Sequence, residues 1–107
     1  METDIEINYE KKYETLVREK ILSLFDKTDV KIYLFGSRSR GDYKRGSDFD
    51  IGFENIEEKI FRKLKIKFLD YLEESIVPYK VDMVLFDSAV PDFVKEAKKD
   101  LIIWKDD

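Results

Sequence analysis

The chain has 107 residues, which is enough for a single domain with one hydrophobic core, and we place that domain over residues 1–107. The 43% of hydrophobic residues is typical of a folded protein, and the net charge of −4, from 20 Lys and Arg against 24 Asp and Glu, disfavours stable nucleic-acid binding. The chain has no cysteine and no histidine, so disulfides, Cys or His zinc ligands and Ser-His-Asp triads are excluded.

The expected elements alternate between helices and strands. Apolar residues recur at helical spacing over residues 9–25, and a short β-prone run at 31–35 ends at Gly36. A turn-rich stretch at 37–47 leads into an alternating strand at 48–53, and a long amphipathic helix is expected over 56–72. A strand at 80–86, expected to be the most buried one, precedes a short helix that begins near Pro91 and an edge strand in the tail at 101–104.

This order predicts an α+β (mixed α/β) fold, in which helices cover a small sheet. The strands on the two sides of the turn are too close in sequence for a parallel crossover, which needs a dozen or more residues. We therefore expect the small sheet to be mixed.

Glycine is concentrated in one part of the chain, where the backbone must turn sharply or approach a ligand closely. The four glycines are Gly36, Gly41, Gly46 and Gly52. Gly36 and Ser37 follow a strand directly, and nearby basic residues (Arg38, Arg40, Lys44, Arg45) suit an anion such as a triphosphate. The P-loop pattern fails because Asp42-Tyr43 stands where Lys and Ser or Thr are required, and a surface hairpin with solvated charges is an equal alternative for this stretch alone.

Two acidic residues share one face of the strand that follows the turn. The strand period of two places Phe49 and Ile51 on one side, and Asp48 and Asp50 on the other, roughly 6–7 Å apart. Two like charges on one face repel each other, and a bound divalent cation would turn that cost into a gain. The pair therefore predicts a site for a hard cation such as Mg²⁺.

A third acid, Asp82, interrupts the apolar strand at 80–86. Alternation places it opposite Val81 and Met83, and Asp is disfavoured in the middle of a strand. Taken alone, it is equally well explained as an acid that faces solvent on an edge strand. Three carboxylates beside a phosphate-binding turn, however, suit phosphoryl transfer with two metal ions about 3.5–4 Å apart.

These motifs together resemble a known family. Gly36-Ser37, ten intervening residues, Asp48-Phe49-Asp50 and the later strand Asp82 are similar to the signature of the DNA polymerase β-like nucleotidyltransferases. The resemblance is closest to the minimal nucleotidyltransferases, which include the antitoxins of HEPN/MNT toxin–antitoxin pairs, and it covers nearly the whole chain.

The resemblance implies a role for each matched residue. Gly36 and Ser37 would hold the β- and γ-phosphates of ATP, with help from Arg38, Arg40 and Ser47. Asp48 and Asp50 would ligate two Mg²⁺ ions, and Asp82 would ligate the catalytic ion and accept the proton of the attacking hydroxyl. By the same resemblance, AMP would pass from ATP to a tyrosine of a partner HEPN toxin.

Other acceptors remain open. A tRNA 3′ end is disfavoured as the acceptor by the negative net charge, and a small hydroxylated molecule is disfavoured by the lack of a second domain. A further alternative is a non-catalytic antitoxin that acts by binding alone, but such a protein has no need of three clustered acids.

Because no elements remain to close the far side of the cleft, we expect a homo- or hetero-oligomer. No apolar run approaches the roughly 18 residues of a membrane span and no signal peptide is present, so we expect a cytoplasmic protein without membrane contact.

Overall fold

The computed structural model describes residues 4–41 and 48–106, and the side chains from residue 10 onward within these ranges. Helices and strands alternate along the chain in nearly the order that the sequence predicts. The elements are α1 (Asp4–Leu24), β1 (Lys31–Phe35), α2 (Ser37–Arg40), β2 (Phe49–Glu54), α3 (Glu58–Glu74), β3 (Val81–Leu85), the 3₁₀ helix η1 (Phe86–Ser88), α4 (Pro91–Ala97) and β4 (Ile102–Lys105).

The strands form one four-stranded sheet in the order β3-β2-β1-β4. Strand β1 is antiparallel to both β2 and β4, whereas β2 and β3 are parallel and are joined by α3. The expected mixed sheet and the α+β fold are therefore confirmed.

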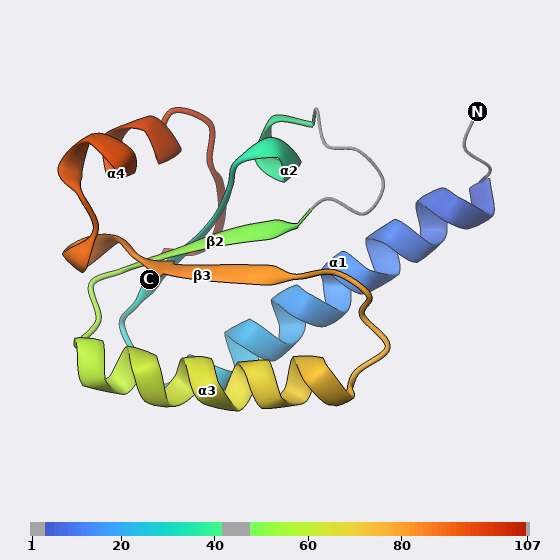
Figure 1. The fold of residues 1–107 in the computed structure, drawn as a ribbon, viewed down its shortest axis with the longest axis horizontal. Coiled ribbons are helices and arrows are strands. Elements are labelled where there is room, and N and C mark those ends of the chain that lie inside the picture. The colour runs from blue at the N-terminus through green and yellow to red at the C-terminus, as the bar shows by residue number, and fades with distance from the viewer. Residues whose placement is uncertain (1–3, 42–47, 107) are drawn as a thin grey trace.

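One face of the sheet holds the main core. Helices α1 and α3 lie on this face, below the sheet in Figure 1. Alternate strand residues point into this layer, because side chains one residue apart in a strand face opposite sides. They pack against Phe25, Phe61 and Phe68 of the helical layer, and the strand residues of this core are Ile32, Leu34, Phe49, Ile51, Phe53, Val81, Met83 and Leu85.

The opposite face has a smaller apolar cluster. Tyr33 and Phe35 of β1 pack there with Phe86, and Val94 and Ala97 of α4 lie against them. Helices α2 and α4 occupy this side of the sheet (Figure 1), and a hollow remains beside them. Helix α4 has no buried residue of its own, so this face is only thinly covered.

Two expectations about the elements need correction. Strand β3 lies at the edge of the sheet and is not the most buried strand, because only its alternate residues are buried, whereas four of the five residues of β1 are. The stretch after Gly36, expected as a turn, begins with the short helix α2. The tail strand is confirmed as β4. No helix in the described part of the chain has the length and hydropathy to cross a bilayer.

Candidate active site

Asp50 and Asp82 lie opposite each other on the open face of the sheet. Because β2 and β3 are parallel, the register pairs Asp50 with Asp82, and the two carboxylates project from neighbouring strands at the same level. Their flanking residues Phe49, Ile51, Val81 and Met83 are buried on the other face. The strand alternation predicted for both acids is confirmed, and residues 32 positions apart in the sequence become neighbours.

The surroundings of Asp50 oppose its ionisation. Burial raises the pKa of the Asp50 carboxyl above its ordinary value, and the negative charges of Asp82 and Asp48 raise it further. The positive charges of Arg40 and Lys80 act in the opposite direction. Like charges held together on a partly buried face are what a divalent cation would relieve.

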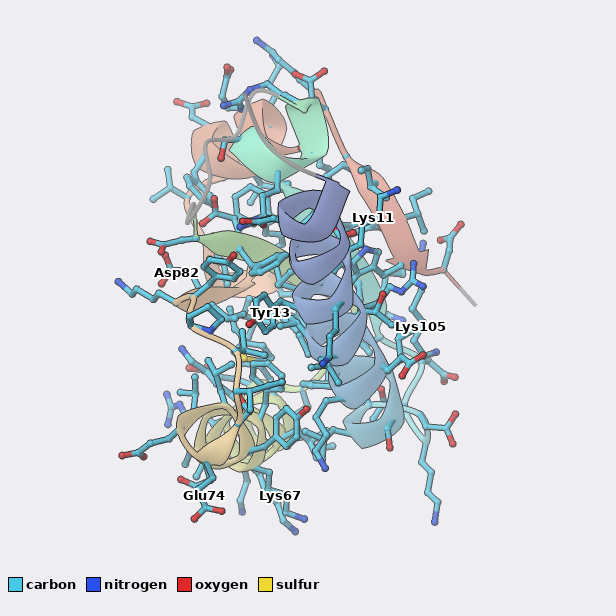
Figure 2. All side chains as sticks on the ribbon, turned by 90° about the vertical axis from the view of Figure 1, so that its right-hand side faces the viewer. Lys11, Tyr13, Lys67, Glu74, Asp82 and Lys105 are labelled. Atoms are coloured by element: carbon cyan, nitrogen blue, oxygen red, sulfur yellow. The ribbon has the colours of Figure 1, made fainter. Side chains whose placement is uncertain are left out.

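Asp82 is the more accessible of the two paired acids. Its side chain is 44% exposed and lies 3.6 Å from Lys80 Nζ, in a surface ion pair of little energetic value. Figure 2 shows Asp82 at the rim of the molecule with its carboxylate directed outward. Edge position and exposure agree with the solvent-facing alternative for this residue alone, whereas its register with Asp50 gives it a second acid as a neighbour.

Asp48 is exposed and stands immediately before β2. Within residues 4–41 and 48–106, no group of three or more acidic residues is arranged so that it could hold a metal ion. The structure thus pairs Asp50 with Asp82 and places Asp48 close enough to influence Asp50. A donor set of a few carboxylates suits Mg²⁺, which usually takes one or two protein carboxylates together with substrate phosphates and water.

Gly36 connects β1 to α2 directly beside Asp50. Its backbone has φ 76° and ψ −154°, a region that is essentially restricted to glycine. A Cβ at this position would overlap the Asp50 carboxylate oxygen Oδ2. Gly36 therefore brings the backbone of the turn into contact with the carboxylate.

Ser37 is the first residue of α2. The Gly36 carbonyl accepts hydrogen bonds from the Ser39 and Arg40 N–H groups at 3.2 and 3.3 Å. In the described part of the chain, neither the N–H nor the hydroxyl of Ser37 has a hydrogen-bond partner. Both groups are thus available to an anion beside Asp50.

Arg38 and Arg40 have different surroundings. The Arg38 side chain is only 2% exposed, and its Nη1 lies 3.2 Å from Glu10 Oε2 on α1. This placement gives Arg38 a structural role in place of the expected direct phosphate contact. Arg40 is exposed and lies near Gly36, which agrees with its expected position, and Ser47 lies outside the described residues.

Two adjoining hollows surround these groups. A hollow of about 640 Å³ is lined by Asp50, Asp82 and Lys80, and another of about 420 Å³ by Gly36 and Arg40. Phe35 and Phe93 line both hollows and contact each other edge to face, with ring centroids 5.9 Å apart. The acids and the turn thus border one concave region.

Sequence reasoning missed several residues around this region. Phe93, which the sequence places only within the short helix that begins near Pro91, is 44% exposed and lines both hollows. Lys80 was assigned to a strand and not to the site. Its sequence position two residues before Asp82, on the same strand face, is the signal that could have identified it.

Comparison with known proteins assigns the chain to a class. Residues 14–104 match the family described as the nucleotidyltransferase domain, so the chain belongs to that family of transferases. The resemblance to the minimal nucleotidyltransferases is confirmed by solved structures with the same fold. None of the curated proteins matches the chain.

Three of these structures illustrate the similarity. A toxin–antitoxin crystallised with AMP-PNP has 26% identity and a TM-score of 0.59, with 81% of this chain and 71% of that chain covered. A protein assigned to the minimal nucleotidyltransferases has 26% identity and a TM-score of 0.57, with 84% and 93% covered. The complex of a tri-AMPylated HEPN toxin from Shewanella oneidensis with its MNT antitoxin has 23% identity and a TM-score of 0.56, with 84% and 70% covered, and shows the shared fold alone.

Proposed function

We propose that the protein transfers AMP from ATP to a hydroxyl group, in a reaction that depends on Mg²⁺. The observation that carries the proposal is the pairing of Asp50 with Asp82 on parallel strands, with the glycine-dependent turn at Gly36 in contact with Asp50. This arrangement belongs to a chain of the nucleotidyltransferase family. Because the proposed donor is ATP, we place the reaction in the cytoplasm.

The carboxylates supply the ligands for the cation. Asp48 and Asp50 would hold two Mg²⁺ ions, with Asp82 as a further ligand of one of them. Mg²⁺ bound here would supply positive charge that neutralises the triphosphate. The raised pKa of Asp50 supports this assignment, because the crowded negative charges that raise it would be relieved by a cation.

The turn supplies the phosphate contacts. Gly36 and Ser37 would bind the β- and γ-phosphates through the Ser37 N–H and hydroxyl, and Arg40 and Ser47 would add polar contacts. Fixed donors at these positions hold the triphosphate in line for attack, and positioning supplies much of the rate in phosphoryl transfer.

The acceptor hydroxyl would approach from the side of Asp82. The oxygen of the acceptor hydroxyl forms a bond to the α-phosphorus of ATP. The bond from the α-phosphorus to the oxygen that bridges to the β-phosphorus breaks, and pyrophosphate leaves. Asp82 accepts the hydroxyl proton, a role that its 44% exposure and outward direction support.

We propose a tyrosine of a HEPN toxin as the acceptor, which makes the protein an antitoxin. The similarity to a toxin–antitoxin bound to AMP-PNP, at 26% identity, supports this choice. The open hollow beside Asp82 supports it as well, because an acceptor carried by another protein needs access from outside. The complex of chain and toxin would then be a hetero-oligomer.

The experiment that tests this function is transfer of label from α-labelled ATP to the protein that copurifies with the chain, with Mg²⁺ and with EDTA. Transfer should require Mg²⁺ and add an adenylate mass to a partner tyrosine. Asp50→Asn and Asp82→Asn should each lower the rate by more than the roughly 10–100-fold typical of groups that only support a metal ligand.

Asp70→Asn is the matched control, because Asp70 is an exposed acid on α3 outside both hollows. Its rate should equal that of the unmodified chain. Full activity in the Asp50 and Asp82 variants refutes the site, and a tightly bound partner that stays unmodified identifies an antitoxin that acts by binding alone.

A further inference from the structure

A buried polar cluster connects α2 to α1, and none of its members lines either hollow. Glu10 of α1 and Arg38 of α2 are 8% and 5% exposed as whole residues, the only buried charged residues in the described part of the chain. Tyr79, just before β3, completes the cluster. A buried charge is costly unless it is paired, so these side chains need one another.

Each member of the cluster contacts the other two. Arg38 donates to Glu10 Oε2 at 3.2 Å, and the Tyr79 hydroxyl donates to Glu10 Oε1 at 2.6 Å. The Arg38 guanidinium lies 4.9 Å from the centroid of the Tyr79 ring and 4.0 Å from that of Phe49. Both Glu10 oxygens are therefore used, and the guanidinium is held between a carboxylate and two aromatic rings.

The cluster joins the three segments that carry the candidate active site. Arg38 follows Ser37 of the turn, Phe49 lies between Asp48 and Asp50, and Tyr79 lies three residues before Asp82. The Phe49 N–H also donates to the Lys80 carbonyl at 3.0 Å, which ties the start of β2 to the residue after Tyr79. A shift of any one segment would disturb contacts with the other two.

Helix α2 is a short element that depends on contacts with the rest of the fold. It spans only four residues, too few to be stable by itself, and it has no side-chain cap. On its other side, the Ser39 hydroxyl lies within hydrogen-bonding distance of the Gly36 and Asp100 carbonyl oxygens. The buried arginine therefore gives α2 an attachment to α1 in addition to the contact of Ser39 with Asp100.

We propose that Glu10, Arg38 and Tyr79 form an anchor that fixes the turn at Gly36-Ser37 relative to the carboxylates of β2 and β3. They are positioning residues, because they reach the nucleotide only through α2, and this part of the proposal rests on the function proposed above. Lys is a poor substitute for Arg38, because it lacks the planar group that pairs with Glu10 and stacks on the rings at the same time.

Amide exchange followed by NMR tests the anchor without any need for activity. In Arg38→Met, Glu10→Gln and Tyr79→Phe, the Ser39 and Arg40 amides should exchange faster than in the unmodified chain. For Arg38→Met the increase should be at least about tenfold, as expected for loss of a charged hydrogen bond. The Phe61 amide of α3, bonded to the Glu57 carbonyl just before that helix, serves as the internal reference.

A matched ion pair on α3 provides the control variants. Arg62 and Glu58 are 2.6 Å apart but 71% and 56% exposed, so Arg62→Met and Glu58→Gln should leave both exchange and nucleotide binding unchanged. Equal increases at α2 and α3 in the anchor variants would mean general destabilisation, and this result overturns the anchor. Arg38→Lys, which keeps the charge, should lie between Arg38→Met and the unmodified chain.

Nucleotide kinetics test the positioning role. Arg38→Met and Glu10→Gln should raise KM for ATP about tenfold and should also lower kcat, because the turn that holds the triphosphate in line for attack loses its place while the carboxylates keep theirs. An unchanged KM in a variant whose α2 amides exchange faster contradicts the positioning role. If the unmodified chain neither binds nor transfers ATP, the proposed function fails, and the exchange measurements still decide whether the anchor exists.

Discussion

At the scale of single residues, Gly36 is the position where backbone conformation and site chemistry coincide. Its φ of 76° and ψ of −154° and its contact with Asp50 both exclude a side chain. Gly36→Ala should destabilise the protein by about 1–3 kcal/mol from backbone strain and should abolish nucleotide transfer by displacing the carboxylate. Urea unfolding and the labelled-ATP assay measure the two effects.

Gly41 offers a matched control for Gly36→Ala. It also has a positive φ, 78°, but a Cβ there would meet nothing within 4 Å. Gly41→Ala should cost roughly 1–2 kcal/mol and leave the contact of Gly36 with Asp50 intact. Equal activity in the two alanine variants would mean that the close approach to Asp50 is unimportant.

Two tyrosines should make the protein sensitive to alkali. Burial raises the pKa of Tyr33 and of Tyr79 to about 12, and the neighbouring carboxylates of Glu54 and Glu10 contribute in the same direction. In the unfolded chain both phenols titrate near 10, so between pH 10 and 12 the unfolded state releases protons that the native state keeps. The free energy of unfolding should therefore fall as the pH rises through this window.

Urea unfolding between pH 8 and 11 measures this alkaline loss of stability. A variant with Phe at both tyrosine positions should be less stable at pH 8, because it lacks the bonds to Glu10 and Glu54, yet should lose less stability as the pH rises. If its stability falls with pH as steeply as that of the unmodified chain, other groups cause the effect.

The residues whose roles were predicted from sequence differ from Arg38 in a physical way. The period of a strand fixes the face of Asp50 and of Asp82 without knowledge of the rest of the fold. The partner of Arg38 is 28 residues away on α1, and only the docking of that helix buries the guanidinium. Side chains whose surroundings come from distant segments lie beyond local pattern analysis.

At the scale of elements, the two sheet faces differ in how they are covered. Phe86 is 4% exposed in the smaller cluster, and its ring fills the space above Gly52. Phe86→Ala should cost about 3–5 kcal/mol, because the ring packs against Tyr33, Phe35 and the rigid strand backbone at Gly52, and its loss leaves a cavity there. Phe93→Ala on α4, where the ring is 44% exposed, should cost clearly less in the same urea measurements.

The prediction that β3 is the most buried strand was wrong because it, too, depends on segments that are distant in the sequence. Its apolar sequence, Val81 to Leu85, is also typical of a central strand, because periodicity reports which faces are covered and not which strands are neighbours. The order of strands depends on where the crossover through α3 delivers the chain. The mixed sheet was predictable, since the short link between β1 and β2 forces them to be antiparallel.

At the scale of the whole molecule, the four-stranded mixed sheet is consistent with membership of the nucleotidyltransferase family. One sheet with helices on both faces (Figure 1) supplies the turn at Gly36 and the carboxylates, and two hollows lie beside them. The acceptor is the part of the reaction that the sequence left open, because its recognition depends on the shape of another molecule. The partner-modification assay described above is therefore the measurement that bears on the protein as a whole.

The parallel pairing of β2 with β3 also links catalysis to the order in which the chain assembles. Asp50 and Asp82 become neighbours only after α3 has folded back across the sheet. A segment of the chain must therefore include β2, α3 and β3 to contain the pair. A nascent or partly unfolded molecule would therefore lack the carboxylate pair on which the proposed cation site depends. Any activity at this pair therefore depends on long-range folding and cannot reside in a local segment of the chain.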